Sequence, residues 1–331
     1  MSGEWNHKIF GVKETGFEAL ALEIFEFQRI SNPVYRDYLE ALQINPATIS
    51  SVYQIPFLPI RFFKSHNVQT DSFTPEAVFE SSGTTASINS RHLVKKLSLY
   101  EESFEKGFKF FYGGIKEYCI IGLLPSYIER KNSSLVYMVD KLVRLSEHPL
   151  SGFYPDEYEK LFTVLIELEK KKQKTLLIGV TFALLDFAEK YAADIFREPL
   201  QHITIMETGG MKGRRKEMIR QEIHDNLKKA FNCGTIHSEY GMTELLSQAY
   251  SKGEGVFNCP PWMKILVRDE EDPLSIRKQG FGVINVVDFA NIYSCSFIAT
   301  DDAGKVNEDG SFEVLGRIDG SDLRGCSLMV V

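Results

Sequence analysis

The chain has 331 residues, of which 44% are hydrophobic and 25% are charged, and its formal net charge at pH 7 is −7. This balance is typical of a globular protein and provides enough apolar residues for one large domain or two smaller ones. A negative surface repels nucleic acids and anionic lipids, so the composition argues against either as the main partner.

The sequence shows no sign of a membrane span or of an export signal. No stretch approaches the roughly 20 apolar residues that a membrane-spanning helix needs, and the N-terminus lacks the basic start and apolar run of a signal peptide. The five cysteines are irregularly spaced, without a CxxC pair. An odd number of such cysteines is typical of free thiols in a reducing compartment, and we therefore expect a cytoplasmic protein.

The first 75 residues are expected to be mostly helical. The clearest amphipathic helix is FEALALEIFEFQRI, residues 17–30. In residues 55–68 the prolines Pro56 and Pro59 favour an extended backbone. A further helix is predicted over residues 99–111, after a loop rich in hydroxyl side chains.

Apolar strands and amphipathic helices alternate in the middle of the chain. Strands are predicted at residues 118–125, 175–181, 202–207 and 234–241, and helices at 156–172, 182–192 and 214–231. The helix at 214–231 carries apolar residues at four-residue spacing along one face. Because parallel strands need crossover connections, the alternation predicts a parallel sheet flanked by helices.

The pattern changes beyond residue 260. Short strand-like runs at residues 264–268, 282–289, 294–300 and 304–317 are separated by Gly, Asn and Asp. Such runs predict antiparallel hairpins. We therefore predict an α/β chain with a helical N-terminal part (1–75), an α/β part (76–245) and a β-rich part (246–331).

The loop ESSGTTAS, residues 80–87, combines hydroxyl side chains with one glycine. Gly83 lets the backbone approach a ligand closely, and hydroxyls and amides can donate hydrogen bonds to a polyphosphate; the hydroxyl residues are Ser81, Ser82, Thr84 and Thr85. A polar surface loop is the alternative. The stretch is not a Walker motif, because no GK[ST] follows.

Three stretches further along the chain carry polar residues in a specific order. SEYGMTE (238–244) follows a predicted strand, and ligands of open parallel sheets bind at such strand ends. IATDDAG (298–304) offers paired carboxylates that suit ribose hydroxyls. LGRIDGSDLRG (315–325) places two arginines around a turn. Each stretch alone is typical of a turn, but together they are specific.

With these motifs the sequence resembles the adenylate-forming superfamily of acyl-CoA synthetases, adenylation domains and luciferases. SSGTTAS is similar to its phosphate loop, EYGMTE to its adenylate-binding motif, TDDAG to its ribose-binding motif and GRIDGSDLRG to its hinge. Within it the chain most resembles LuxE-type acyl-protein synthetases, with some likeness to phenylacetate-CoA ligases, through FLPIRFFKSH, ETGGMKGRRKE and the ending RGCSLMVV.

The resemblance implies a single domain over residues 1–331 with the large-domain fold of the adenylate-forming enzymes, in which parallel sheets with flanking helices precede a β-rich part. It also implies a reaction in which a carboxylic acid, expected to be a fatty acid, and ATP with Mg²⁺ give an acyl-adenylate and pyrophosphate. A thiol then takes the acyl group. The site's task is mostly positioning and charge stabilisation.

The resemblance also implies roles for individual residues. Gly83 and its hydroxyl neighbours Ser81, Ser82, Thr84 and Thr85 would hold the β- and γ-phosphates. Tyr240, followed by Gly241, would stack on adenine, Thr243 would bond the α-phosphate, and Glu244 would hold Mg²⁺. Asp302 would accept from the ribose, with Asp301 in place of the usual glycine, and Arg317 would approach ribose and phosphate. The adenine would be bordered by Glu207, Thr208, Gly209 and Gly210.

Two departures from the family pattern concern positive charge. The phosphate loop continues as ASINSRH, without the usual lysine. The chain also stops just after the hinge, where the family's small C-terminal domain would bring a catalytic lysine. LuxE-type proteins are similarly short. Arg317, Arg324 or Lys212 could supply the missing cation.

The acyl acceptor is expected to be a thiol. In LuxE-type proteins a cysteine near the C-terminus takes the acyl group and passes it to a reductase partner, and Cys326 has that position. The alternative for Cys326 is packing in an apolar terminal strand, and the other four cysteines are expected in the core. Further candidates are His237, Tyr127 and Ser134 at the acyl pocket, and His92 at phosphate. For His237 the alternative is a hydrogen-bonded strand position, and for His92 an exposed helix start.

Two other functions stay open at this point. The chain could pass the acyl group to CoA or to a carrier protein, as a ligase of the phenylacetate-CoA type would. It could also be a module that binds a nucleotide or acyl-adenylate without turnover.

Overall fold

The computed structural model describes residues 2–81, 88–124, 132–155, 157–191, 196, 198–209 and 218–318. The chain divides into two compact units. The terminal unit combines residues 1–72 with residues 261–331, and the central unit comprises residues 73–260. The three predicted parts, with boundaries near residues 75 and 245, are consecutive along the chain, whereas the terminal unit joins both ends of the chain. That the whole chain forms a single domain stays a prediction.

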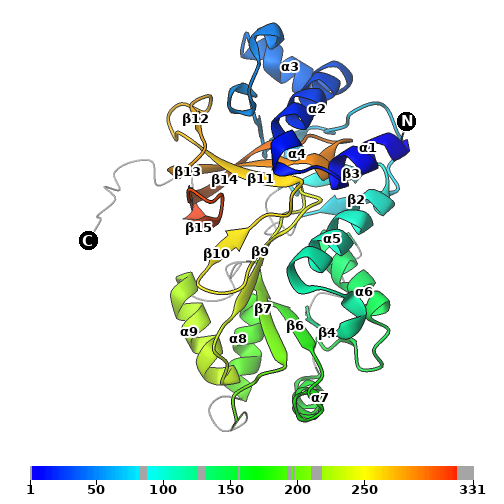
Figure 1. Ribbon diagram of the computed structural model, residues 1–331, viewed down its shortest axis with the longest axis vertical. Helices are drawn as coiled ribbons and strands as arrows, with labels where there is room; N and C mark the ends of the chain where they lie inside the picture. The colour runs from blue at the N-terminus through cyan, green and yellow to red at the C-terminus, as the bar shows by residue number, and fades with distance from the viewer. Residues whose placement is uncertain are drawn as a thin grey trace, which may run out of the picture. The chain divides into compact units, whose positions relative to one another are not determined.

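Helices dominate the N-terminal segment of the terminal unit (Figure 1): α1 (Ser2–Phe10), α2 (Phe17–Ser31), α3 (Pro33–Ala41) and α4 (Phe62–Ser65). The predicted amphipathic helix at 17–30 is confirmed as α2, which buries Phe17, Leu20, Ile24 and Phe25. Short 3-10 turns follow α3, at Pro46–Thr48 and Val52–Gln54. The expected extended stretch at 55–68 is wrong in part, because α4 forms once the backbone has passed Pro59.

The C-terminal segment of the terminal unit is an antiparallel sheet. Its strands are β11 (Met263–Arg268), β12 (Ile276–Arg277), β13 (Gly280–Asp288), β14 (Phe297–Val306) and β15 (Phe312–Arg317), in the order β12-β11-β13-β14-β15. The short strand β1 (Leu58–Pro59) pairs in parallel with β14. The predicted antiparallel hairpins are therefore confirmed.

One strand of this sheet is longer than expected. The runs predicted at 294–300 and 304–317 share the continuous strand β14, which includes residues 301–303. A Cβ atom on Gly304 would lie 2.6 Å from Ile284 Cδ1 and 2.7 Å from the Glu313 carbonyl oxygen. Gly304 thus lets β13 and β15 approach β14 closely instead of ending the strand.

The central unit contains the predicted parallel sheet. Its strands β4 (Cys119–Leu123), β5 (Gly152–Phe153), β6 (Thr175–Val180), β7 (Ile203–Thr208) and β8 (His237–Tyr240) run parallel in the order β8-β7-β6-β4-β5. The strands β9 (Ala249–Ser251) and β10 (Val256–Asn258) continue it antiparallel beyond β8. A separate hairpin, β2 (Ala77–Glu80) and β3 (Arg91–Val94), flanks the hydroxyl-rich loop.

Helices cover both faces of this sheet: α5 (Leu97–Tyr112), α6 (Ser134–Ser146), α7 (Tyr158–Lys170), α8 (Thr181–Lys190) and α9 (Arg220–Phe231), with a 3-10 turn η4 (Ile115–Glu117) before β4. His237 contacts Tyr112 of α5, whereas the next residue of β8, Ser238, contacts His224 of α9. Because neighbouring strand residues point to opposite faces, α5 and α9 pack on opposite faces of the sheet.

The predicted helix at 214–231 starts later than expected. In the structure α9 begins at Arg220, and Met218 and Ile219 before it are not helical. The Glu222 carboxylate accepts a hydrogen bond from the Ile219 backbone N–H, which satisfies a free donor at the helix start. Ile219 itself is 68% exposed, so this position lies outside the apolar stripe that the spacing suggested.

Among the described residues, no helix has the length and apolar character that crossing a membrane requires. Of the cysteines expected in the core, Cys119 and Cys295 are buried, whereas Cys233 and Cys259 are only half-buried. Cys326 lies outside the described residues.

Candidate functional site

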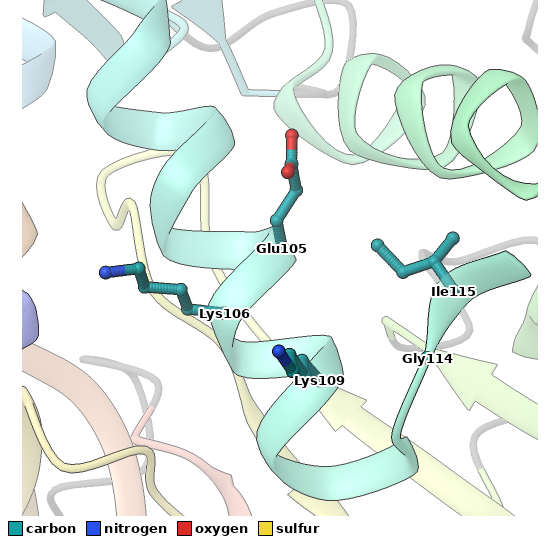
Figure 2. Close-up of a pocket in the computed structure, with 5 residues that line it drawn as sticks. All are labelled: Glu105, Lys106, Lys109, Gly114 and Ile115. Atoms are coloured by element: carbon teal, nitrogen blue, oxygen red, sulfur yellow. The ribbon is translucent and has the colours of Figure 1, made fainter.

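A shallow pocket of about 180 Å³ lies at the C-terminal end of α5 (Figure 2). Its lining residues are Glu105, Lys106, Lys109, Gly114 and Ile115. Ile115 precedes β4, so the pocket lies at the amino end of that strand. Ligands of open parallel sheets bind at the opposite, carboxyl ends, and the volume is below the roughly 300 Å³ of small ligand pockets. The candidate site is therefore at the other edge of the sheet.

At that edge β7 and β8 end side by side. Glu207 and Thr208 are the last residues of β7, and Tyr240 is the last residue of β8. Thr208 is paired in register with Glu239. Gly209 has a φ of 71°, a left-handed conformation that suits glycine. The structure thus brings together the predicted residues Glu207, Thr208, Gly209, Tyr240 and Gly241, while Gly210 lies outside the described residues.

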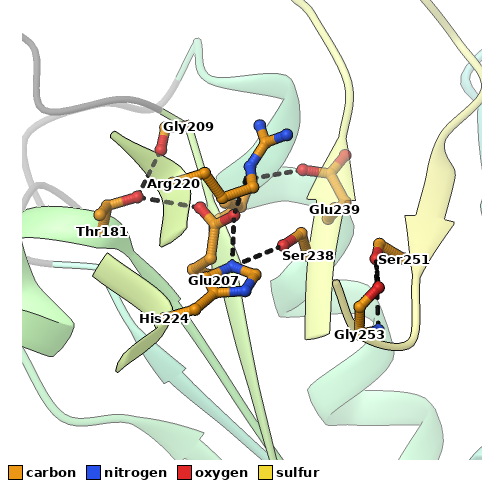
Figure 3. Close-up of polar contacts among 10 residues, drawn as sticks. Thr181, Glu207, Gly209, Arg220, His224, Ser238, Glu239, Ser251 and Gly253 are labelled. Carbon is orange, nitrogen blue, oxygen red and sulfur yellow. Dashed lines mark hydrogen bonds and ion pairs between the residues drawn. The ribbon is translucent and has the colours of Figure 1, made fainter. Parts of the chain in front are cut away.

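The Glu207 carboxylate is buried and contacted from several sides (Figure 3). Its Oε2 accepts a hydrogen bond from the Thr181 hydroxyl at 3.0 Å, and the same hydroxyl lies against the Gly209 carbonyl. Its Oε1 lies 3.6 Å from His224 Nε2 and 3.7 Å from Arg220 Nε. Burial by itself raises the pKa of Glu207, but the hydrogen bonds and the Arg220 charge outweigh it and hold the pKa below its ordinary value.

The neighbouring Glu239 carboxyl has the opposite electrostatic character. Glu239 is only 8% exposed and accepts a hydrogen bond from the Thr208 hydroxyl. Burial, reinforced by the Glu207 charge and opposed by the Thr208 hydrogen bond, raises the pKa of Glu239 to about 7. The pKa values of two adjacent carboxyl groups are therefore shifted in opposite directions.

The predicted adenine-stacking residue, Tyr240, is itself supported by an aromatic ring. Tyr240 is 8% exposed. Its ring centroid lies 6.0 Å from that of Phe257 on β10, in an edge-to-face arrangement. Such a contact restricts the Tyr240 ring.

His92 connects the hairpin that flanks the hydroxyl-rich loop to the SEYGMTE motif. His92 is 1% exposed on β3, so the exposed helix start expected as an alternative is wrong. Its Nδ1 lies 2.9 Å from the Thr243 carbonyl oxygen, and this contact requires a proton on Nδ1 because a carbonyl only accepts. Burial lowers the pKa of His92 to about 4, so the ring is neutral. Glu244, next to Thr243, is buried.

Ser81 and Ser90 pair with each other at the two ends of the hydroxyl-rich loop. Ser81 Oγ accepts from the Ser90 N–H at 2.9 Å, and the Ser81 N–H donates to the Ser90 carbonyl at 3.0 Å. The remaining loop residues predicted to hold phosphate, Ser82, Gly83, Thr84 and Thr85, lie outside the described residues. Lys212, Arg324 and Tyr127 are outside them as well.

In the terminal unit the two adjacent aspartates of TDDAG do not form the expected carboxylate pair. Asp302 Oδ1 lies 3.5 Å from Arg317 Nε, and these two residues are register partners on β14 and β15. Asp301 Oδ2 lies 3.2 Å from Arg61 Nε. Neighbouring strand residues point to opposite faces, which separates the two carboxylates. Asp302 and Arg317 are thus placed together, as their predicted roles require.

Two of the lesser candidates have structural roles. His237 is a hydrogen-bonded strand residue, as one of the two interpretations expected, with Nδ1 3.2 Å from the Tyr112 hydroxyl. Ser134 begins α6, and its carbonyl accepts from the Tyr100 hydroxyl.

Sequence reasoning missed the residues that support the strand ends: Thr181, Arg220, His224, Glu239 and Phe257. Thr181 is the last residue of the strand predicted at 175–181, and this place at a strand end is a usable signal. Glu239 lies inside the SEYGMTE motif, but a sequence does not reveal that its carboxyl group is buried without a cation beside it. The contacts of Arg220 and His224 depend on how α9 packs. Within the described residues no group of three or more His, Cys, Asp or Glu could hold a metal ion by itself.

Comparisons with known proteins show which family and which enzymes the chain is similar to. The family described as "Acyl-protein synthetase, LuxE" matches residues 10–331. The long-chain-fatty-acid–luciferin-component ligase of Aliivibrio fischeri is 21% identical over 336 residues, which cover 94% of this chain and 86% of the relative.

Solved structures with the same fold include two kinds of enzyme. A 2-hydroxyisobutyryl-CoA ligase in complex with 2-HIB-AMP and CoA aligns with a TM-score of 0.64 at 12% identity, over 95% of this chain and 70% of that one. The luciferase-like enzyme of the mealworm Zophobas morio aligns with a TM-score of 0.54 at 15% identity, over 76% and 60%. At these identities the likeness shows the fold, and it confirms the predicted adenylate-forming fold class.

Proposed function

The chain belongs to the acyl-protein synthetase (LuxE) family, an enzyme family that activates carboxylic acids with ATP and transfers the acyl group, and we propose that its acid is a long-chain fatty acid and its acceptor Cys326. The name of the Aliivibrio fischeri relative supports a long-chain fatty acid. The proposed place of action is the cytoplasm, where a cysteine stays reduced.

The observation that carries the proposal is the strand-end arrangement of Glu207, Gly209 and Tyr240. It fits an adenine ring in three respects. Tyr240 offers a ring held by Phe257. Gly209 offers backbone without a side chain, whereas the side-chain position of Gly241 is taken by Glu239, whose Oε1 would lie 2.3 Å from a Cβ there. The Thr181 hydroxyl fixes the carbonyl of Gly209.

The chemical step joins the acid to the α-phosphorus of ATP. A carboxylate oxygen attacks that phosphorus, the bond to the β-phosphate oxygen breaks, and pyrophosphate leaves. The carboxyl carbon then carries AMP as a good leaving group. In this proposal Thr243 bonds the α-phosphate, Asp302 holds the ribose and Arg317 approaches both, so the protein positions the reactants and stabilises charge.

The protein groups near Thr243 would hold Mg²⁺ only together with the phosphates of the nucleotide. Mg²⁺ is usually held by one or two carboxylates plus substrate phosphates. Glu244, which is buried next to Thr243, is the proposed carboxylate. Mg²⁺ would neutralise phosphate charge during the reaction.

The acceptor is proposed to be the thiolate of Cys326. It attacks the carbonyl carbon of the acyl-adenylate, a thioester forms, and AMP leaves with the bonding electron pair. A reactive cysteine needs accessible thiolate. Burial raises the pKa of Cys119 and Cys233 to about 11 and that of Cys295 to about 12, which argues against these three as acceptors. A reductase would take the acyl group from Cys326.

The test is exchange of labelled pyrophosphate into ATP, measured over a series of saturated fatty acids and an aromatic acid, followed by intact mass. Exchange that depends on a long-chain acid, together with a mass increase of one acyl group, is expected. Exchange without a protein thioester, and with product on added CoA, would favour a CoA ligase. ATP binding without exchange for any acid would favour a non-catalytic binding module.

A further inference from the structure

The Glu207 carboxylate joins three elements of the central unit (Figure 3). Thr181 contacts it from the start of α8, and Arg220 and His224 contact it from α9. Glu207 itself ends β7, one of the two strands of the proposed adenine site. Thr181 also contacts the backbone of the site, at Gly209.

The position of Arg220 is by itself unfavourable for a positive charge. Arg220 is the first residue of α9, and the helix macrodipole disfavours a cation at a helix N-terminus. Two contacts offset this cost. Its Nε lies 3.7 Å from Glu207 Oε1, and its guanidinium carbon lies 5.0 Å from the centroid of the Phe257 ring. Such a cation–ring contact is favourable.

Through Phe257 the arginine reaches the proposed adenine-stacking ring. The Phe257 ring packs edge-to-face on Tyr240 with centroids 6.0 Å apart. The turn before Phe257 is shaped for the arginine: Gly255 has a φ of +68°, and a Cβ there would lie 3.0 Å from Arg220 Cδ. Arg220 therefore touches Glu207 on one side and the ring that supports Tyr240 on the other.

His224 ties the same carboxylate to the second strand. Its Nε2 lies 3.6 Å from Glu207 Oε1 and 3.3 Å from Ser238 Oγ, and Glu207 and Ser238 are register partners on β7 and β8. His224 is 2% exposed, so water does not compete for these contacts. The histidine thus fixes the carboxylate relative to both strand ends.

We propose that Arg220 and His224 are positioning residues that set nucleotide specificity: they hold the Glu207 carboxylate and the Phe257–Tyr240 ring pair in the arrangement that accepts an adenine base in preference to guanine. In this proposal neither residue contacts the base itself. The proposal rests on the proposed function, because it assumes that the strand ends bind the base.

The experiment measures the dissociation constants of ATP and GTP by calorimetry without acid, so that no turnover is needed. The variants are Arg220→Gln, Phe257→Leu, His224→Leu and His224→Gln, whose amide can still donate to Glu207. Lys229→Gln, an exposed charge on the same helix, is the control. Thermal unfolding checks that each variant is folded, and Phe257→Leu tests the ring contact without removing a charge.

We expect Arg220→Gln, Phe257→Leu and His224→Leu to lower the preference for ATP over GTP by about tenfold, which is less than the roughly 100-fold that a 1 Å misplacement can cost. His224→Gln should restore most of the preference, and Lys229→Gln should leave it unchanged. Equal weakening of both nucleotides, or an unchanged preference in folded variants, would overturn the inference. If only the proposed activity is wrong, wild-type protein prefers ATP but fails to exchange pyrophosphate with any acid.

Discussion

The carboxyl group of Glu239 accepts a hydrogen bond from the hydroxyl of Thr208, its register partner on the neighbouring strand, and among the described residues no cation forms an ion pair with it. Its pKa is raised from 4.5 to about 7, with burial as the main cause. Between these values the folded protein binds a proton that the unfolded chain releases. Stability therefore falls as the pH rises through this window.

Glu239→Gln should remove this fall in stability at higher pH, because glutamine imitates the neutral carboxyl group. Relative to wild type, the variant should gain on the order of 3 kcal/mol of unfolding free energy between about pH 4 and about pH 8. Urea unfolding at the two pH values measures it, with exposed Glu308→Gln as the control. An equal pH dependence in wild type and variant would show that Glu239 is ionised in the folded protein.

Gly241→Ala should disturb the site through the same carboxyl group. The added Cβ would lie 2.3 Å from Glu239 Oε1, closer than atoms can approach. We expect a loss of about 1–3 kcal/mol in stability from this overpacking and weaker ATP binding. In Gly241→Ala/Glu239→Ala the clash is gone, so the effects of the two changes should not add.

The matched control for this clash is Gly234→Ala, where an added Cβ meets nothing within 4 Å. It should behave as wild type. Additive effects in the double variant would mean that Gly241 is required for a reason other than Glu239.

Asp302 and Asp301 offer a matched pair on one strand. Asp302 is buried opposite Arg317, whereas Asp301 pairs with Arg61. If Asp302 accepts from the ribose, Asp302→Asn should raise the KM for ATP by about tenfold or more with an unchanged KM for the acid. Asp301→Asn should leave both within about twofold.

Steady-state kinetics with ATP and with its deoxyribose analogues provides the measurement. The Asp302→Asn variant should discriminate less between ATP and the deoxy analogues than wild type does. A similar rise in KM for both aspartate variants would contradict the ribose role.

The main parallel strands of the central unit could be predicted because burial on both faces gives strands such as β4 and β6 an unbroken apolar run. The continuity of β14 could not, because Asp301, Asp302 and Gly304 are individually typical of turns. Their strand conformation depends on pairing with β13 and β15, which only the folded chain supplies.

The candidate site divides in the same way. Tyr240, Gly209 and Asp302 could be placed because a local motif carries each of them. The residues that hold the site in place could not be predicted. Arg220 and His224 contact Glu207 from α9, and no short stretch of sequence shows how that helix packs. The neutral state of His92 likewise follows from burial of β3 and not from neighbouring residues.

Cys326→Ser separates activation from transfer. Because Cys326 is proposed to act only after the adenylate has formed, the variant should keep acid-dependent pyrophosphate exchange within about twofold and lose the protein-bound thioester. Cys259→Ser, at a half-buried cysteine, should keep both. Intact mass after incubation with ATP and acid reads out the thioester, and its persistence in Cys326→Ser would assign the acceptor elsewhere.

The central claim, that the acid is activated as an adenylate, is tested most directly by following the oxygen atoms. A fatty acid labelled with heavy oxygen in its carboxyl group is incubated with the protein and ATP, with hydroxylamine as an acceptor to allow turnover. The account predicts AMP that carries one labelled oxygen, because the carboxylate attacks the α-phosphorus and its oxygen stays with AMP. Labelled inorganic phosphate together with ADP would contradict the account, since the attack would then be at the γ-phosphorus.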